Sequence, residues 1–69
     1  MYIGYSDQYG TPAIVLKDEL VSPNDVVKMA RLEEAFIKNR DGLQFVVRFP
    51  GRPIELYTEK ALRRSLNSK

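Results

Sequence analysis

The sequence predicts a single small α+β domain, residues 1–69, in which the elements follow in the order ββαββα. Two observations support this fold class. Alternating apolar residues from Leu43 to Phe49 lead into a Pro50-Gly51 turn, as in a β-hairpin. Apolar residues also recur at helical spacing after Ser22-Pro23, as in an amphipathic helix. We therefore expect a four-stranded, mostly antiparallel sheet with two helices packed on one face.

The first two strands are expected to form a hairpin. The segment from Tyr2 to Tyr5 is typical of a short strand, and residues 7–10 are typical of a turn in which Gly10 takes a positive φ. Ala13 to Leu16 is a continuous apolar run, which indicates a strand covered on both faces or lying against a helix. Pro12 cannot donate a ladder hydrogen bond, so we expect it beside the turn or at a sheet edge.

A long helix is predicted from Pro23 to about Asn39. Ser22 precedes it as a capping residue, and Asp25 lies where the acid of a capping box would be. Proline suits the first helical position because its missing N–H is not needed there. The Asp-Gly pair at 41–42 ends the helix.

This helix would carry more apolar surface than one sheet can cover, since a helix on a sheet needs a stripe only about 100° wide. One row consists of Met29, Leu32 and Phe36, and a neighbouring row consists of Val26, Val27, Ala30 and Ile37. The excess is covered by the last helix, by another subunit or by nothing, and we assign the first row to partner binding. Glu33 falls inside the apolar arc, either with its stem packed and its carboxylate in water or as a buried acid paired with an arginine.

The second hairpin and the last helix complete the predicted fold. Its strands span residues 43–49 and 54–56, and its tip contains a type II turn in a loop ending at Pro53. Thr58 is the expected N-cap of the last helix. Leu62 and Leu66 are one turn apart and form its inward face.

Composition leaves little material for catalysis. The chain has no cysteine and no histidine, so thiol nucleophiles, imidazole bases and the commonest metal ligands are absent. Its glycines are scattered singly and form no phosphate-binding loop. We therefore expect no enzyme activity, no cofactor and no metal. No segment approaches the roughly 20 apolar residues of a membrane span, and we expect a cytoplasmic protein.

Charge is distributed unevenly along the chain. Residues 1–42 contain five basic and seven acidic side chains, whereas residues 43–69 contain six basic and two acidic ones. The second segment therefore predicts a basic face carried by Arg48, Arg52, Arg63 and Arg64. Such a face contacts the phosphates of a nucleic acid, meets an acidic patch on another protein, or is only a solvated surface.

From Leu20 onward, the capped helix, the Asp41-Gly42 break, the arginine-bearing hairpin and the last helix resemble the excisionase-type winged helix-turn-helix layout. The resemblance covers about two thirds of the chain and implies DNA binding through residues 43–69. It requires a break between Val27 and Phe36, where no glycine or other turn residue occurs. No residue roles are transferred from it.

A small regulatory, adaptor or inhibitor protein that acts by protein–protein binding accounts best for these features. A wide apolar helix on a chain this short favours a protein partner or a homodimer. The contact residues would be the helix row, the four arginines, or both. The alternative is a small DNA-binding protein of the excisionase-like kind. Tyr2, Tyr5 and Tyr9 are either half-buried at a sheet edge or a stacking platform for bases.

Overall fold

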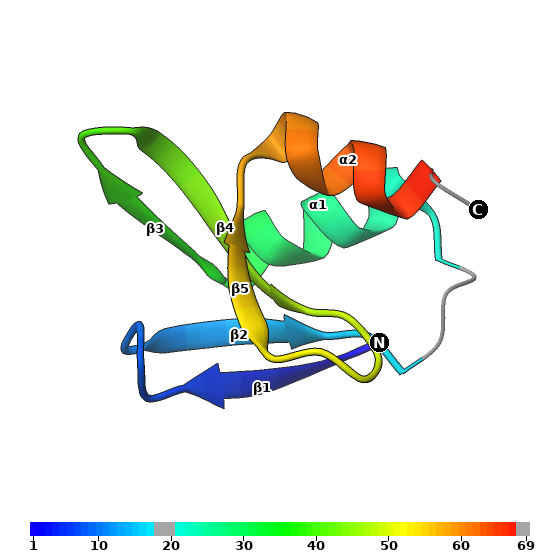
Figure 1. Cartoon of the computed structure of the whole chain (residues 1–69), viewed down its shortest axis with the longest axis horizontal. Helices are drawn as coiled ribbons and strands as arrows, with labels where there is room; N and C mark the ends of the chain where they lie inside the picture. Colours follow the sequence, from blue (N-terminus) through cyan, green and yellow to red (C-terminus); the bar gives the residue numbers. More distant parts are fainter. Residues whose placement is uncertain (18–20, 68–69) are drawn as a thin grey trace.

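The computed structural model describes residues 1–17 and 21–67, which form an α+β domain of five strands and two helices (Figure 1). The elements are β1 (Tyr2–Ser6), β2 (Thr11–Val15), α1 (Pro23–Leu32), β3 (Phe36–Asn39), β4 (Gly42–Arg48), β5 (Ile54–Tyr57) and α2 (Glu59–Asn67). The α+β class is confirmed. The expected four-stranded ββαββα order is wrong, because the chain contributes a further strand between α1 and β4.

Strand β4 is the centre of the sheet and has neighbours along both edges. Along one edge it pairs antiparallel with β5, where Phe45 lies opposite Tyr57. The other edge is shared end to end by two strands. β3 pairs antiparallel with the first part of β4, and β2 pairs parallel with its last part, where Ile14 lies opposite Val47. β1 pairs antiparallel with β2 and is the outermost strand of the mixed sheet.

Helix α1 ends at Leu32, and its predicted extension to Asn39 is wrong. Residues 36–39 form β3 instead, and the next helix, α2, begins only at Glu59. The excisionase-type layout requires a second helix soon after the first. Among the described residues, a strand occupies that place.

A Schellman motif ends α1 without a glycine. Glu34 has a φ of 57°, in the left-handed region. Its N–H donates to the carbonyl of Arg31 at 3.3 Å, and the N–H of Ala35 donates to the carbonyl of Ala30 at 2.8 Å. These two bonds define the motif, whose left-handed position is usually glycine. A glutamate there gives no helix-stop signal in the sequence, which explains the error in the predicted boundary.

The predicted turns agree with the structure. Gly10 has a φ of 64° in the turn of the first hairpin. Gly51 has a φ of 74°, and the N–H of Arg52 donates to the carbonyl of Phe49 at 3.1 Å, as expected for a type II turn over Pro50-Gly51. Both hairpins are therefore placed where local sequence predicts them.

The predicted helix starts agree with the structure only in part. The N–H of Ala61 donates to the hydroxyl of Thr58 at 3.1 Å, which confirms Thr58 as the N-cap of α2. Ser22 occupies the N-cap position of α1, but its side chain makes no capping hydrogen bond. Only its carbonyl accepts from the N–H of Val26, at 3.0 Å. The start of α1 is correct, and the predicted side-chain cap is wrong.

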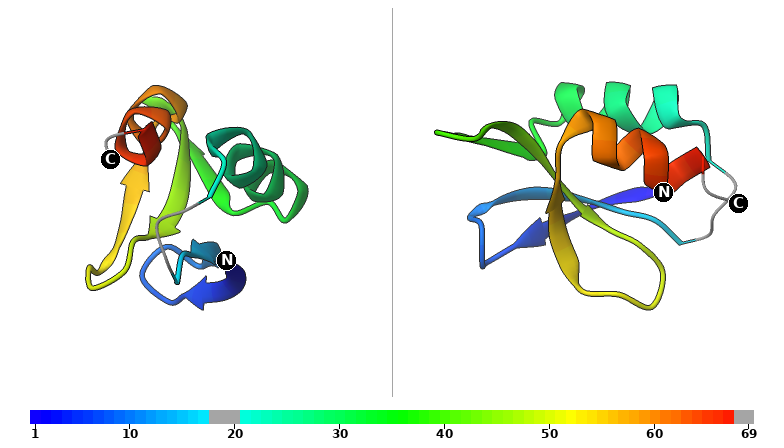
Figure 2. Two further views of the ribbon diagram at one scale, coloured as in Figure 1. Left: turned by 90° about the vertical axis from the view of Figure 1, so that its right-hand side faces the viewer. Right: turned by 45° about the horizontal axis from the view of Figure 1, so that its top comes forward.

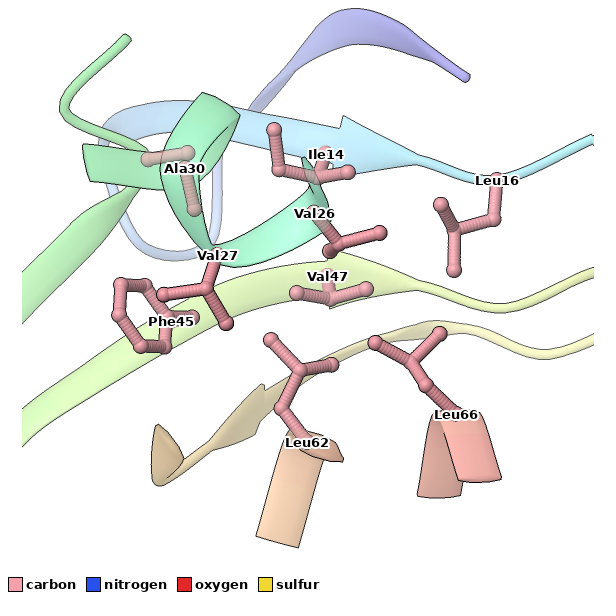
Figure 3. Packing of buried hydrophobic residues seen from close by; sticks show 10 residues of the cluster. Ile14, Leu16, Val26, Val27, Ala30, Phe45, Val47, Leu62 and Leu66 are labelled. Carbon is pink, nitrogen blue, oxygen red and sulfur yellow. The ribbon is translucent and has the colours of Figure 1, made fainter. Parts of the chain in front are cut away.

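The main core lies between the two helices and one face of the sheet (Figure 2). Its buried side chains are Ile14 and Leu16, Val26, Val27 and Ala30 of α1, Ala35, Phe45 and Val47 of β4, and Leu62 and Leu66 of α2. Figure 3 shows the two α2 leucines pointing toward Val47. Both helices therefore pack on one face of the sheet, as predicted.

The opposite face of the sheet is also buried at its centre. Ala13, Val15 and Val46 alternate with the core residues along β2 and β4, and all three are buried. The apolar run from Ala13 to Leu16 is buried throughout, as expected for a strand that is covered on both faces or lies against a helix.

Candidate interaction surfaces

The predicted partner-binding row of Met29, Leu32 and Phe36 is divided between two elements. Met29 and Leu32 lie on α1, whereas Phe36 is the first residue of β3. The Phe36 ring packs edge-to-face on the ring of Phe45, with 6.3 Å between centroids, and it borders the core. Phe36 therefore stabilises the β3–β4 pair, and only Met29 and Leu32 are left as a common helix surface.

Leu32 is the most exposed large apolar side chain of the described residues, at 71%. It borders a hollow of about 300 Å³ whose wall also contains Met1 and Met29. Asp25 and Lys28 line the same hollow and give it one charge of each sign. We call the surface formed by these five residues the α1 hollow. It is mainly apolar and open to solvent. It is lined by one face of α1 and by Met1.

The position of Glu33 follows from the end of α1. Glu33 is the C-cap residue, its φ is −89°, and its side chain is exposed. The interpretation of Glu33 as a buried acid is wrong, because the helix no longer continues past it to enclose the carboxylate.

Of the four arginines assigned to the predicted basic face, Arg63 makes its contacts within the fold. Its Nε donates to Glu59 Oε2 at 3.1 Å, and its terminal nitrogen donates to Asn24 Oδ1 at 2.7 Å. Asn24 lies in the first turn of α1, so Arg63 joins the two helices. This arginine is half-buried and is less accessible to a partner than the sequence suggested.

Arg31, which sequence reasoning did not single out, completes this cluster. It donates to Glu59 Oε1 at 2.9 Å, and its guanidinium lies 5.5 Å from the centroid of the Phe45 ring. Hydrogen bonds from Arg31 and then Arg63 hold the pKa of the Glu59 carboxyl below its ordinary value. Arg31 and Glu59 are 28 positions apart, so no local pattern in the sequence could have paired them.

Arg48 and Arg52 lie at the β4–β5 hairpin and are both exposed. The Nε of Arg48 donates to the carbonyl of Arg52 at 3.1 Å, which holds one side of the loop. Beside them, the Tyr57 hydroxyl donates to Glu55 Oε1 at 2.9 Å. Burial, followed by this bond, raises the pKa of Tyr57, and Arg52 partly opposes the effect.

The arginines do not gather into one basic face. Arg64 is exposed on α2, and both views of Figure 2 separate α2 from the hairpin tip that carries Arg48 and Arg52. A phosphate backbone or an acidic patch would therefore meet two small, separate groups of positive charge.

The outer strand β1 is a second exposed surface. Tyr2, Ile3 and Tyr5 are 46%, 36% and 63% exposed. Tyr2 and Tyr5 point to opposite faces of the strand, and Tyr9 lies in the turn after it, so the three tyrosines do not share one stacking face. The Lys17 Nζ lies over the Tyr2 ring, 5.3 Å from its centroid, and partly covers that face of the ring.

Within residues 1–17 and 21–67, no three acidic side chains gather closely enough to hold a metal ion. Neither helix is long and apolar enough to cross a membrane. No family model, curated protein or solved structure matches this chain.

Proposed function

We propose that this chain is a non-enzymatic regulatory or adaptor protein of the cytoplasm that acts by binding another protein through the α1 hollow. The observation that carries the proposal is the exposure of Leu32 beside the hollow that it shares with Met1 and Met29. A single exposed leucine is ordinary on a protein surface. Three large apolar side chains around one concave surface are typical of an interaction site.

The chemistry of the hollow indicates what its partner presents. A large apolar side chain of the partner would fill the space between Met1, Met29 and Leu32 and stabilise the complex by about 1.5–3 kcal/mol when fully buried. Asp25 and Lys28 favour a basic and an acidic group on either side of that apolar side chain. We therefore expect the partner to insert an amphipathic segment, with charges of both signs around an apolar anchor.

Copurification with the variant Leu32→Lys tests this proposal. A lysine at the last position of α1 suits the negative end of the helix, so the variant should stay folded. The charged side chain should prevent the partner's apolar group from entering, and a protein that copurifies with the wild type should be depleted at least about tenfold, as expected from a loss of roughly 1.4 kcal/mol.

Asn67→Lys is the matched control. Asn67 is the exposed last residue of α2, so it receives the same charge at the equivalent helix position, away from the hollow. The control should recover the partner at the wild-type level. Equal recovery by both variants, with both shown to be folded, would contradict the proposed site.

A further inference from the structure

The outer strand β1 differs from the other strands that border the sheet. β3 contains Lys38 and β5 contains Glu55, whereas β1 has the sequence Tyr-Ile-Gly-Tyr-Ser and no charged side chain. Natural proteins commonly place charges, prolines or bulges in edge strands, because unpaired backbone groups there invite pairing with another chain. β1 has none of these protections, and among the described residues no strand pairs with its outer edge.

We propose that β1 pairs antiparallel with β1 of a second copy of this chain, which joins two sheets across a two-fold axis at Gly4. This inference goes beyond the proposed function and is independent of it, since it uses the outer edge of β1 and not the α1 hollow.

Symmetry determines the register of this pairing. A two-fold axis perpendicular to the sheet keeps each side chain on its own face, so residues that lie opposite each other must share a face. With the axis at Gly4, Ile3 lies opposite Tyr5 of the second copy, and Tyr2 lies opposite Ser6. This is the register that pairs all five residues of β1 with β1 of the second copy.

The resulting contacts are complementary. Ile3 and Tyr5 form two symmetric β-branched–aromatic pairs, a combination that stabilises antiparallel strands. Both residues are on the face that the helices cover, because Ile3 lies opposite the core residue Ile14 in the β1–β2 pair. Gly4, at the axis, faces the other side of the sheet and brings no side chain into these pairs.

A second copy is favoured over a foreign peptide, because the strand complements itself in side-chain chemistry. It presents an isoleucine to a tyrosine and a tyrosine to an isoleucine, with no charge to exclude an identical strand. A contact limited to five residues per chain is small, so we expect a weak dimer that dissociates on dilution.

Analytical ultracentrifugation of the full chain from micromolar to millimolar concentration tests the association. The wild type should convert from monomer to dimer in this range. Tyr5→Lys should raise the dissociation constant at least about tenfold, since it places a charge in the centre of the new pair. Tyr5 is the better site than Gly4, because a Cβ at Gly4 would lie 3.0 Å from Cγ2 of Val15 and disturb the fold.

Leu32→Lys is the control, with the same charge on an exposed apolar residue outside β1. It should leave the dimerisation constant unchanged while weakening binding at the α1 hollow, so failure of one proposal is distinguishable from failure of the other. A strictly monomeric wild type, or equal effects of Tyr5→Lys and Leu32→Lys, would overturn the β1 dimer.

Disulfide trapping tests the register, and the absence of native cysteine makes it specific. Chains carrying Ile3→Cys mixed with chains carrying Tyr5→Cys should oxidise quickly to a mixed dimer, because directly opposite Cβ atoms lie about 4.5–5.5 Å apart. Chains carrying Ile3→Cys alone should cross-link much more slowly. Equal rates for the mixed and unmixed samples would overturn the register centred on Gly4.

Discussion

Glu34 is the residue on which the fold departs most from its sequence signals. It holds a left-handed backbone conformation with a φ of 57°, and its carbonyl accepts a hydrogen bond from the Thr11 hydroxyl at 3.1 Å. The buried neighbours Ala30 and Ala35 hold the chain on both sides of this turn. Tertiary packing thus enforces a helix end that local sequence does not indicate.

The substitution Glu34→Gly should stabilise the protein. A left-handed conformation costs a non-glycine residue roughly 1–2 kcal/mol, and part of the gain is offset by the greater backbone freedom of glycine in the unfolded chain. We expect a net increase of about 0.5–1 kcal/mol in the free energy of unfolding, measured by urea denaturation. Glu33→Gly is the control: Glu33 has an ordinary φ of −89°, so this variant should be destabilised. Loss of stability in Glu34→Gly would contradict the role assigned to the turn.

Glu59 should make stability sensitive to acid. Its folded-state pKa lies below the ordinary value of 4.5, so folding favours the ionised carboxylate. The stability that this carboxylate contributes is complete above pH 4.5 and is lost as the pH falls through the lower folded-state pKa. Glu59→Gln should reduce the loss of unfolding free energy on acidification in this range, as measured by denaturation at several pH values. Arg31→Gln should act in the same direction, because the hydrogen bond from Arg31 is the largest cause of the lowered pKa of Glu59. An unchanged pH profile in both variants would exclude this role.

At the scale of whole elements, the sequence predicts those segments whose signals are local. Both hairpins depend on turn residues such as Gly10 and Gly51, and α2 depends on its Thr58 cap, so all three could be placed. β3 could not, because Phe36 and Ile37 continue the helical spacing of α1 and only the turn at Glu34 separates them from it. The parallel pairing of β2 with β4 joins segments far apart in the chain, and such pairing leaves no local signal.

The two helices provide a matched pair of leucines. Leu62 of α2 is fully buried, whereas Leu32 of α1 is 71% exposed. Leu62→Ala should lower the free energy of unfolding by about 2–5 kcal/mol, because it leaves a cavity in the core. Leu32→Ala should change it by less than about 0.5 kcal/mol. Thermal or urea denaturation of the two variants measures both effects, and similar losses would mean that Leu32 is buried in solution.

At the scale of the whole molecule, the distribution of charge along the sequence is only a partial guide to the surface. The excess of basic residues after residue 42 predicted one basic face. In the folded chain, Glu59 of α2 bonds both Arg63 and Arg31, and the exposed arginines after residue 42 lie in two separate places. Counting charges in a segment cannot reveal which of them pair across the fold. The apolar surfaces could be predicted only in part, since Met29, Leu32 and the tyrosines of β1 were singled out, whereas Met1 was not.

We expect this arrangement to disfavour tight nucleic-acid binding. If Arg48, Arg52 and Arg64 all contacted duplex DNA, log–log salt dependence would have a slope of about −2.7, from roughly −0.9 per contact. We expect fluorescence anisotropy to show no such binding at physiological salt. Saturable binding with this slope, abolished by Arg48→Ala together with Arg52→Ala, would restore the DNA-binding alternative.

We propose that this chain recognises a protein partner through the α1 hollow and not through its arginines. Amide chemical shifts of the isotope-labelled chain, recorded while the copurified partner is added, test this claim residue by residue. The largest changes should fall on Met1 and on residues 25–32 of α1, with small changes at residues 48–52. Maximal changes at the β4–β5 hairpin or on α2, with α1 unaffected, would contradict the claim.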